Sequence, residues 1–272
     1  APLEAFVALE SVAALEAWGT GDVALFLEIA ADLDLAAMGR GAGRYLSYGA
    51  YPTAAGPVFA RGIWAEGALG AFDPALIAED LSHAWMLGEA AHPDKGQTVP
   101  DEAMRDPGYS WCKAPRLGGL GYETGALARQ VVDGHPLARA LAGEGSVRAR
   151  IVGRLLEIAR TQLVMEAMLA GIDPAARFMA DWAAPRDGVG EGLVEAARGA
   201  LGHWCRIEKG RIASWQIIAP TTWNFSPRDA GGVPGPLEAA LVGAEVQPGE
   251  DTPIAVQHIV RSFDPCMVCT VH

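Results

Sequence analysis

Two cysteines near the end of the sequence, Cys266 and Cys269, constrain this chain more than any other feature. They form a Cys-x-x-Cys motif that is followed by only three residues, the last of which is His272. In thioredoxin-like redox proteins this motif opens a helix, and no room for such a helix follows here. Thiolates at this spacing hold soft or borderline metal ions, so the motif predicts a metal site. The alternative is a pair of unconnected buried thiols.

Composition excludes several classes of function. The 272 residues carry a formal net charge of −12, which disfavours nucleic acids and anionic membranes as partners. The sequence contains no apolar run of about 18 residues and no basic-then-apolar start, so neither a transmembrane segment nor a signal peptide is predicted. Four cysteines in so long a chain form no disulfide framework, and we therefore expect a cytoplasmic location, or a partner that holds the protein at a membrane. The sequence begins without an initiator Met and directly with residues that predict a helix, as expected of a fragment or a processed piece.

Hydrophobic periodicity predicts a mainly α fold. The longest expected helix spans 146–169, where Val147, Ile151, Leu155 and Ile158 recur at helical spacing. Alternating residues at 204–207 and 212–219 predict a β hairpin. Other helices are expected at 2–18, 22–38, 73–87, 124–132, 236–242 and 252–261, and short strands at 45–48 and 58–64. We predict a single domain over residues 1–272, a long helical bundle with a small β insertion at about 186–230.

Several segments besides the terminal motif carry a family resemblance. They read Tyr109-Ser-Trp-Cys-Lys-Ala-Pro-Arg116, Glu123-Thr-Gly-Ala-Leu-Ala-Arg129, Glu195-Ala-Ala-Arg-Gly-Ala-Leu-Gly-His-Trp204 and Pro220-Thr-Thr-Trp-Asn224. Together with Asp264-Pro-Cys-Met-Val-Cys269 they resemble the large subunit of nickel–iron hydrogenases, in its carboxyl-terminal portion. The wording Val-Cys-Thr-Val-His resembles the cytoplasmic uptake and hydrogen-sensor branch of that family.

The resemblance implies a metal centre. In that family cysteine sulfurs bridge a nickel and an iron, and the iron carries cyanide and carbon monoxide. Matched onto this chain, Cys266 would be a terminal nickel ligand and Cys269 a sulfur shared by both metals. Asp264 would be a carboxylate beside the site, although by sequence alone it serves equally well to end the last helix.

Other residues would complete the surroundings of the metals. By the resemblance, Arg198 would lie over the open face of the metals, and Pro220 and Thr221 would contact the cyanide. The alternative for Arg198 is a salt bridge to Glu195 or Asp264, and Thr221 alone reads as an ordinary loop residue.

The resemblance further implies a magnesium ion, bound by His272 and by the backbone carbonyl near Ile217. Imidazole is not a typical magnesium ligand, so only the resemblance supports this site.

Two departures from the family pattern matter. Ala197 stands where the family usually has Pro, which loosens the backbone before Arg198. The family's amino-terminal Cys-x-x-Cys and its early proton-transferring Glu are absent, and Cys112 and Cys205 stand alone in sequence. This chain therefore holds two of the four thiolates.

The expected function is reversible oxidation of H2 to protons and electrons, in a complex with two further partners. An amino-terminal part of the large subunit would supply the other thiolates. A small iron–sulfur subunit would take the electrons, because this chain lacks cysteines for iron–sulfur clusters. The alternatives are a hydrogen sensor that signals to a kinase and a non-catalytic fragment.

Overall fold

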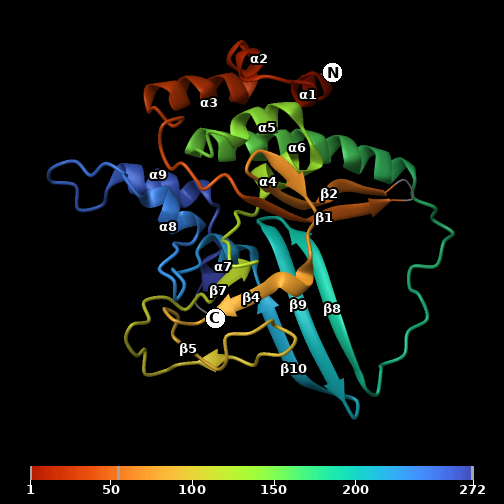
Figure 1. The fold of residues 1–272 in the computed structure, drawn as a ribbon. Coiled ribbons are helices and arrows are strands. Elements are labelled where there is room, and N and C mark those ends of the chain that lie inside the picture. Colours follow the sequence, from red (N-terminus) through yellow and green to blue (C-terminus); the bar gives the residue numbers. More distant parts are fainter. Residues whose placement is uncertain (1, 54–55, 271–272) are drawn as a thin grey trace.

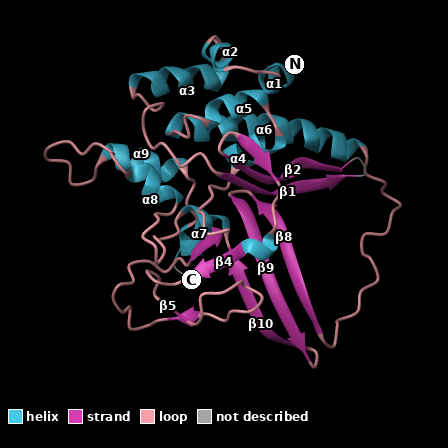
Figure 2. Cartoon of the chain, viewed as in Figure 1, coloured by secondary structure: helices cyan, strands magenta, loops and turns pink. Residues whose placement is uncertain are grey.

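Helices and strands follow one another in runs of one kind along the described chain. The computed structural model describes residues 2–53 and 56–270 (Figures 1 and 2). The helices are α1 Pro2–Val7, α2 Val12–Glu16, α3 Gly21–Asp32, α4 Ala126–Asp133, α5 Pro136–Ala142, α6 Val147–Ala170, α7 Pro220–Asn224, α8 Pro236–Leu241, α9 Ile254–Ser262 and α10 Met267–Thr270. The strands are β1 Tyr45–Thr53, β2 Gly56–Ala65, β3 Ala68–Gly70, β4 Ile77–Asp80, β5 Met86–Leu87, β6 Val99–Pro100, β7 Ala114–Leu117, β8 Gly188–Ala196, β9 Gly199–Glu208 and β10 Arg211–Ile218. The mainly helical, single-domain description made from sequence stays a prediction.

A helical layer covers one face of the first sheet, which β1, β2 and β3 form (Figure 1). In this layer α4 packs against α6 and also against β1 and β2. The two helices can approach closely because Gly153 has no Cβ atom. A Cβ atom at this position would lie only 2.7 Å from the Cα atom of Leu127. The core of this layer contains Leu15, Leu137 and Val152, which are 0% exposed. This core fixes α4, whose amino end reaches the candidate site.

The second sheet is a long antiparallel meander in the order β10-β9-β8. It extends the hairpin that alternation predicts, because β8 adds a third strand along β9, from Gly188 opposite Ile207 to Ala196 opposite Gly199. Trp223, 0% exposed, belongs to the core cluster that also holds Trp204 and Ile218 of this sheet. The sheet thereby places the β8–β9 turn close to α4 and α7.

Two helix predictions are wrong in detail. Residues 2–18 form two helices, because Ser11 adopts an extended conformation and its side chain accepts a hydrogen bond from the amide of Ala14, which starts α2. Residues 73–87 form a short 3-10 turn, Pro74–Leu76, followed by β4 and β5, although Asp73 caps the turn as expected. The spacing of Ile77 and Leu81 suits a helix, but Ile77 pairs with Leu117 in a two-stranded sheet.

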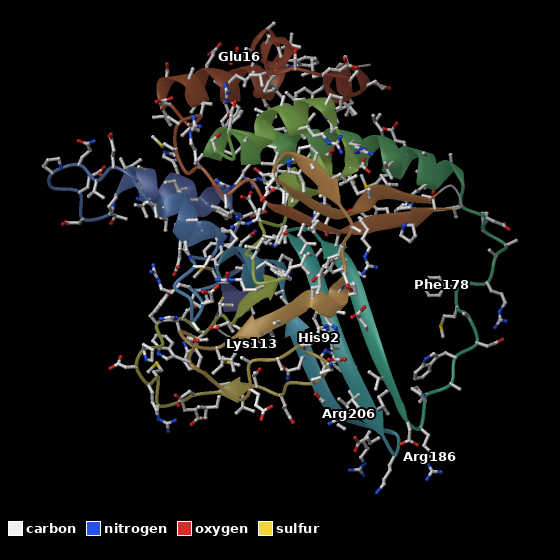
Figure 3. The ribbon with its side chains drawn as sticks, in the orientation of Figure 1. Glu16, His92, Lys113, Phe178, Arg186 and Arg206 are labelled. Atoms are coloured by element: carbon white, nitrogen blue, oxygen red, sulfur yellow. The ribbon has the colours of Figure 1, made fainter. Side chains whose placement is uncertain are left out.

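An extended segment, residues 171–187, links α6 to β8 and stands away from the helical and strand layers (Figure 1). Phe178 is 100% exposed and projects from this segment (Figure 3). Trp182 is 80% exposed. In the described part of the chain, no helix combines the length and the hydrophobicity that a membrane crossing requires.

Candidate metal centre

The two thiols of the terminal motif lie one helical turn apart. The amide of Cys269 donates to the carbonyl oxygen of Cys266 at 3.0 Å, and α10 begins between them at Met267. Residues three apart on a helix face the same side, so both sulfur atoms are available to one ligand. Both cysteines are free and partly exposed. The motif therefore forms a two-thiol site with one open side.

The backbone of this motif is held by α7. The amide of Cys266 donates to Thr221 Oγ1 at 3.1 Å, and Thr221 is 2% exposed. Pro220 opens α7 at the first helical position, where its missing N–H costs nothing. The Asn224 side chain joins this helix to the start of α4, because its amide accepts from the Thr124 N–H and donates to the Thr124 carbonyl, each at 3.0 Å. Residues 220–221 thus form a helix start in contact with Cys266, where sequence predicted a loop.

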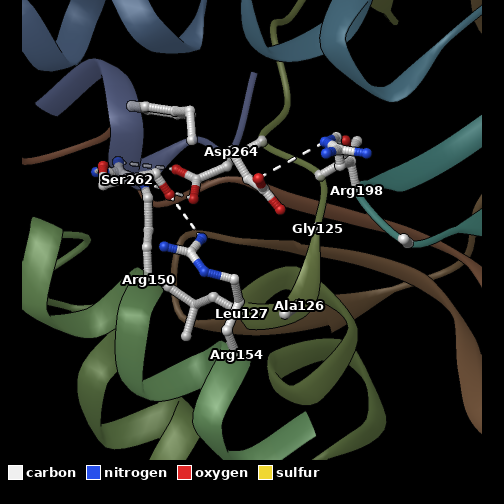
Figure 4. Close-up of a pocket in the computed structure, with 12 residues that line it drawn as sticks. Gly125, Ala126, Leu127, Arg150, Arg154, Arg198, Ser262 and Asp264 are labelled. Atoms are coloured by element: carbon white, nitrogen blue, oxygen red, sulfur yellow. Dashed lines mark hydrogen bonds and ion pairs between the residues drawn. The ribbon is translucent and has the colours of Figure 1, made fainter. Parts of the chain in front are cut away.

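Arg198 and Asp264 face each other across the mouth of a pocket (Figure 4). Arg198 comes from the turn between β8 and β9, and Asp264 follows α9 with a left-handed φ of 54°. The Nε atom of Arg198 lies 3.6 Å from Asp264 Oδ1, and both side chains are nearly half exposed. This is a loose, solvated ion pair rather than the buried salt bridge considered from sequence. Glu195, the other partner considered, pairs with Arg129 instead.

The wall of this pocket is basic. Arg154 Nη1 donates to the carbonyl oxygen of Ser262 at 2.8 Å, which ties α6 to the residue two before Asp264 (Figure 4). Burial lowers the pKa of Arg154, although the Asp264 carboxylate nearby partly offsets that effect. Arg150 lies beside it and binds Glu123 at 2.8 Å. Sequence reasoning missed both arginines, because their charges lie off the apolar stripe of α6 and read as solvent-facing.

The two thiols differ in acidity. A hydrogen bond with the Cys269 side chain lowers the pKa of Cys266, and the Arg198 charge acts in the same direction. Desolvation, followed by the interaction with Cys266, raises the pKa of Cys269 to about 11. Thiolates are the metal-binding form, and the Arg198 cation favours that form at both sulfur atoms.

A second pocket is lined by Cys269, by β10 and by the residue that precedes β7. Ile217 lines this pocket together with Cys269, and its side chain is exposed. Lys113 also lines it, 2.7 Å from the buried Glu79 carboxylate and 3.3 Å from Gln216 Oε1. Lys113 is thus buried and salt-bridged.

His272 lies outside the described residues. Among those residues, no group of three or more histidine, cysteine, aspartate or glutamate side chains could hold a metal ion. Cys112 is 1% exposed, and burial raises its pKa to about 11. Cys205 is only partly buried. The described chain therefore brings together Arg198, Thr221, Asp264, Cys266 and Cys269 and offers two thiols.

Comparisons with known proteins agree with this geometry. A family model described as nickel-dependent hydrogenase matches residues 20–143 and 135–272. The quinone-reactive Ni/Fe-hydrogenase large chain of Wolinella succinogenes is 31% identical over 239 residues, 72% of this chain and 41% of that protein. The periplasmic [NiFeSe] hydrogenase large subunit of Desulfomicrobium baculatum is 34% identical over 78% of this chain and 45% of its own length.

Solved structures show the same relation. The Ni-Fe-Se hydrogenase of D. vulgaris Hildenborough, in its reduced state, superposes with a TM-score of 0.83 at 29% identity, over 92% of this chain and 57% of that chain. The reduced, active Ni-Fe-Se hydrogenase from Desulfomicrobium baculatum gives a TM-score of 0.83 at 30% identity. The chain spans less than half the length of the curated relatives described above.

Proposed function

Because this chain belongs to the nickel-dependent hydrogenase family, we propose that it forms part of a large subunit that oxidises H2 at a nickel–iron centre. The observation that carries the proposal is the convergence of three distant segments. Cys266 and Cys269 present two sulfur atoms on one side of α10, Thr221 binds the backbone beneath them, and Arg198 extends its charge toward both thiols.

The residues present fit such a centre as far as this chain provides ligands. Thiolates are soft donors that suit nickel and iron, and Cys266 and Cys269 would hold the metals from one side. Their partial exposure leaves room for further ligands, which the described residues of this chain do not supply. When bound, the nickel–iron centre supplies the place where H2 is split and from which electrons leave.

The chain's own side chains would handle charge and protons. Arg198 would place a guanidinium over the thiols, and Asp264 at 3.6 Å would orient its Nε edge. A thiolate sulfur would accept the proton released from H2, and the Arg198 side chain would do so only from its neutral form, because a guanidinium has no acceptor. Thr221 would serve twice, since its hydroxyl oxygen accepts from Cys266 while its hydrogen remains free to donate to a cyanide ligand beside Pro220.

The magnesium site belongs to the same proposal. Ile217 lines the pocket next to Cys269, and its backbone carbonyl would bind the ion together with His272, which lies outside the described residues. Gln216 and Thr98, which line that pocket, would serve bound waters, since magnesium keeps much of its hydration shell.

Two partners are proposed. A further part of the large subunit would supply the other two thiolates, and a small iron–sulfur subunit would take the electrons. Support for a polypeptide partner comes from the surface of the 171–187 segment, because Phe178, Met179 and Trp182 are 100%, 69% and 80% exposed. Large apolar side chains grouped in this way mark a protein interface. The cytoplasmic uptake or sensing branch rests on the terminal wording alone.

Activity of the assembled complex tests the proposal. The chain is co-expressed with the rest of the large subunit and with the small subunit, and H2-dependent dye reduction is measured together with nickel and iron content. Cys266→Ser and Cys269→Ser should strongly lower nickel retention and dye reduction, while Cys205→Ser, a free thiol on β9, should leave both unchanged. Full nickel retention in both terminal variants would contradict the proposed site. Full metal content with very slow turnover would favour the hydrogen-sensing alternative.

A further inference from the structure

The turn that carries Arg198 has an unusual backbone for a two-residue hairpin. Ala196 pairs with Gly199, which leaves only Ala197 and Arg198 in the turn. Hairpin turns of this length normally require a positive φ at the first or at both central residues, because the backbone of such turns matches the right-handed twist of the flanking strands. Neither central residue has a positive φ, and Gly199 instead adopts a φ of 132°. The turn therefore needs support from outside its own two strands.

Arg129 of α4 supplies that support. Its Nη1 donates to the carbonyl oxygen of Ala196 and its Nη2 to that of Ala197, each at 3.0 Å. These are the two carbonyl groups that immediately precede Arg198. Arg129 is 2% exposed, so both hydrogen bonds form away from water, where charge-assisted bonds are strong.

Two carboxylates fix the Arg129 guanidinium in turn. Glu157 of α6 accepts from Nε and Nη2, and Glu195 of β8 accepts from Nη1 at 2.6 Å. All five N–H groups of the guanidinium thus have a partner, and these hydrogen bonds prevent the guanidinium plane from rotating. Glu195 also accepts a hydrogen bond from the Tyr48 amide. Strand β1 therefore meets β8 at Glu195, and α6 joins them through Arg129.

The turn also rests on the start of α4. A Cβ atom at Gly199 would lie 2.5 Å from Thr124 Oγ1, so the turn contacts the residue that Asn224 binds. Asn224 belongs to α7, which carries Thr221 and through it Cys266. Arg129 therefore lies on the element that links the turn to the thiols.

We propose that Arg129 is a positioning residue that fixes Arg198 relative to the two thiols by holding the carbonyl groups of residues 196 and 197. This inference rests on the proposed function, in which Arg198 acts beside the metals. A lysine cannot replace Arg129, because a single ammonium group cannot bind both carbonyls and both carboxylates in one plane.

Hydrogen exchange of the full chain tests the structural half without any metal. In Arg129→Lys, the amides of residues 195–200 should exchange roughly tenfold faster than in the unmodified chain, as expected when charge-assisted hydrogen bonds are lost. Arg129→Met with Glu157→Gln and Glu195→Gln removes the whole charge cluster and provides a second variant, should the lysine variant fail to fold. Arg160→Lys is the matched control, because Arg160 also binds a carboxylate and a carbonyl group, those of Asp133 and Val58, away from the turn. Unchanged exchange of 195–200 in either folded Arg129 variant would overturn the inference.

A double-mutant cycle in the assembled, metal-loaded complex tests the functional half. Arg129→Lys should lower kcat/KM for H2, and it should cause no further loss in a complex that already carries Arg198→Lys. Equal fold losses in both backgrounds would mean that Arg129 acts only on stability, and would overturn the positioning role. If Arg198→Lys alone has no effect, the proposed role of Arg198 fails, while the exchange result still reports on the turn.

Discussion

The buried carboxyl group of Glu195 links the stability of this chain to pH. Burial raises the pKa of Glu195 to about 7, and the Arg129 charge only partly offsets that effect. The Arg129 guanidinium is shared with Glu157, whose charge raises the pKa of Glu195 a little further.

The size of the effect follows from the two pKa values. In the unfolded chain Glu195 titrates near 4.5, so at intermediate pH the folded state binds more protons than the unfolded state. Stability must then fall as pH rises. The contribution is fully present below pH 4.5 and is lost as pH passes through about 7. At 1.36 kcal/mol for each pKa unit, the loss amounts to about 3 kcal/mol.

Urea unfolding of the purified chain between pH 4.5 and 8 measures this slope. In Glu195→Gln the fall attributable to this group should disappear. The free energy of unfolding of the variant, minus that of the unmodified chain, should therefore rise by about 3 kcal/mol between the two ends of this pH window. Glu89→Gln, at an exposed position, serves as the control and should keep the slope of the unmodified chain. Parallel pH profiles for the unmodified chain and Glu195→Gln would refute the reasoning.

Three further predictions concern the site. Gly199→Ala should destabilise the chain by about 3 kcal/mol in urea unfolding, because it combines backbone strain at φ 132° with a contact of 2.5 Å between the new Cβ atom and Thr124 Oγ1. As a control, Gly190→Ala has open space around its Cβ atom and should change stability by no more than about 0.5 kcal/mol. Thr221→Val should cost about 1 kcal/mol and speed amide exchange at Cys266, while Thr221→Ser should not, and equal exchange in both variants would count against the hydrogen bond. In the assembled complex, a chelator should remove nickel faster from Cys266→Ser than from the unmodified protein by metal analysis, and identical release would argue that this sulfur is no ligand.

Sequence reasoning succeeded where a pattern is local. The helix expected at 146–169 is observed as Val147–Ala170, because its apolar residues recur at helical spacing and Ser146 caps its first turn. The hairpin around residue 210 was predicted for the same reason. The segment 73–87 was misread because Ile77 and Leu81 have helical spacing, and pairing with a strand some forty residues later decided its structure.

The site shows the same division. Its residues could be named from short motifs, but their supports could not, because these contacts join distant parts of the chain. Arg129 reaches Ala196 and Ala197, and Thr221 reaches Cys266, across separations of 67, 68 and 45 residues. No periodicity marks such pairs. Arg129 was visible in the sequence only as the last residue of a family segment, with no indication of what its five donors bind.

The exposed strand β8 has a consequence for handling the isolated chain. It is an outer strand of its sheet, most of its residues are exposed, and nothing lies within 4 Å of a Cβ built at Gly188, Gly190 or Gly192. An uncovered edge of this kind offers free backbone groups to another edge of the same kind. Glycines weaken the native pairing without blocking a foreign one. At high protein concentration, and without a polypeptide that covers β8, the chain should therefore self-associate through this strand, and a lysine or proline placed on β8 should keep it monomeric.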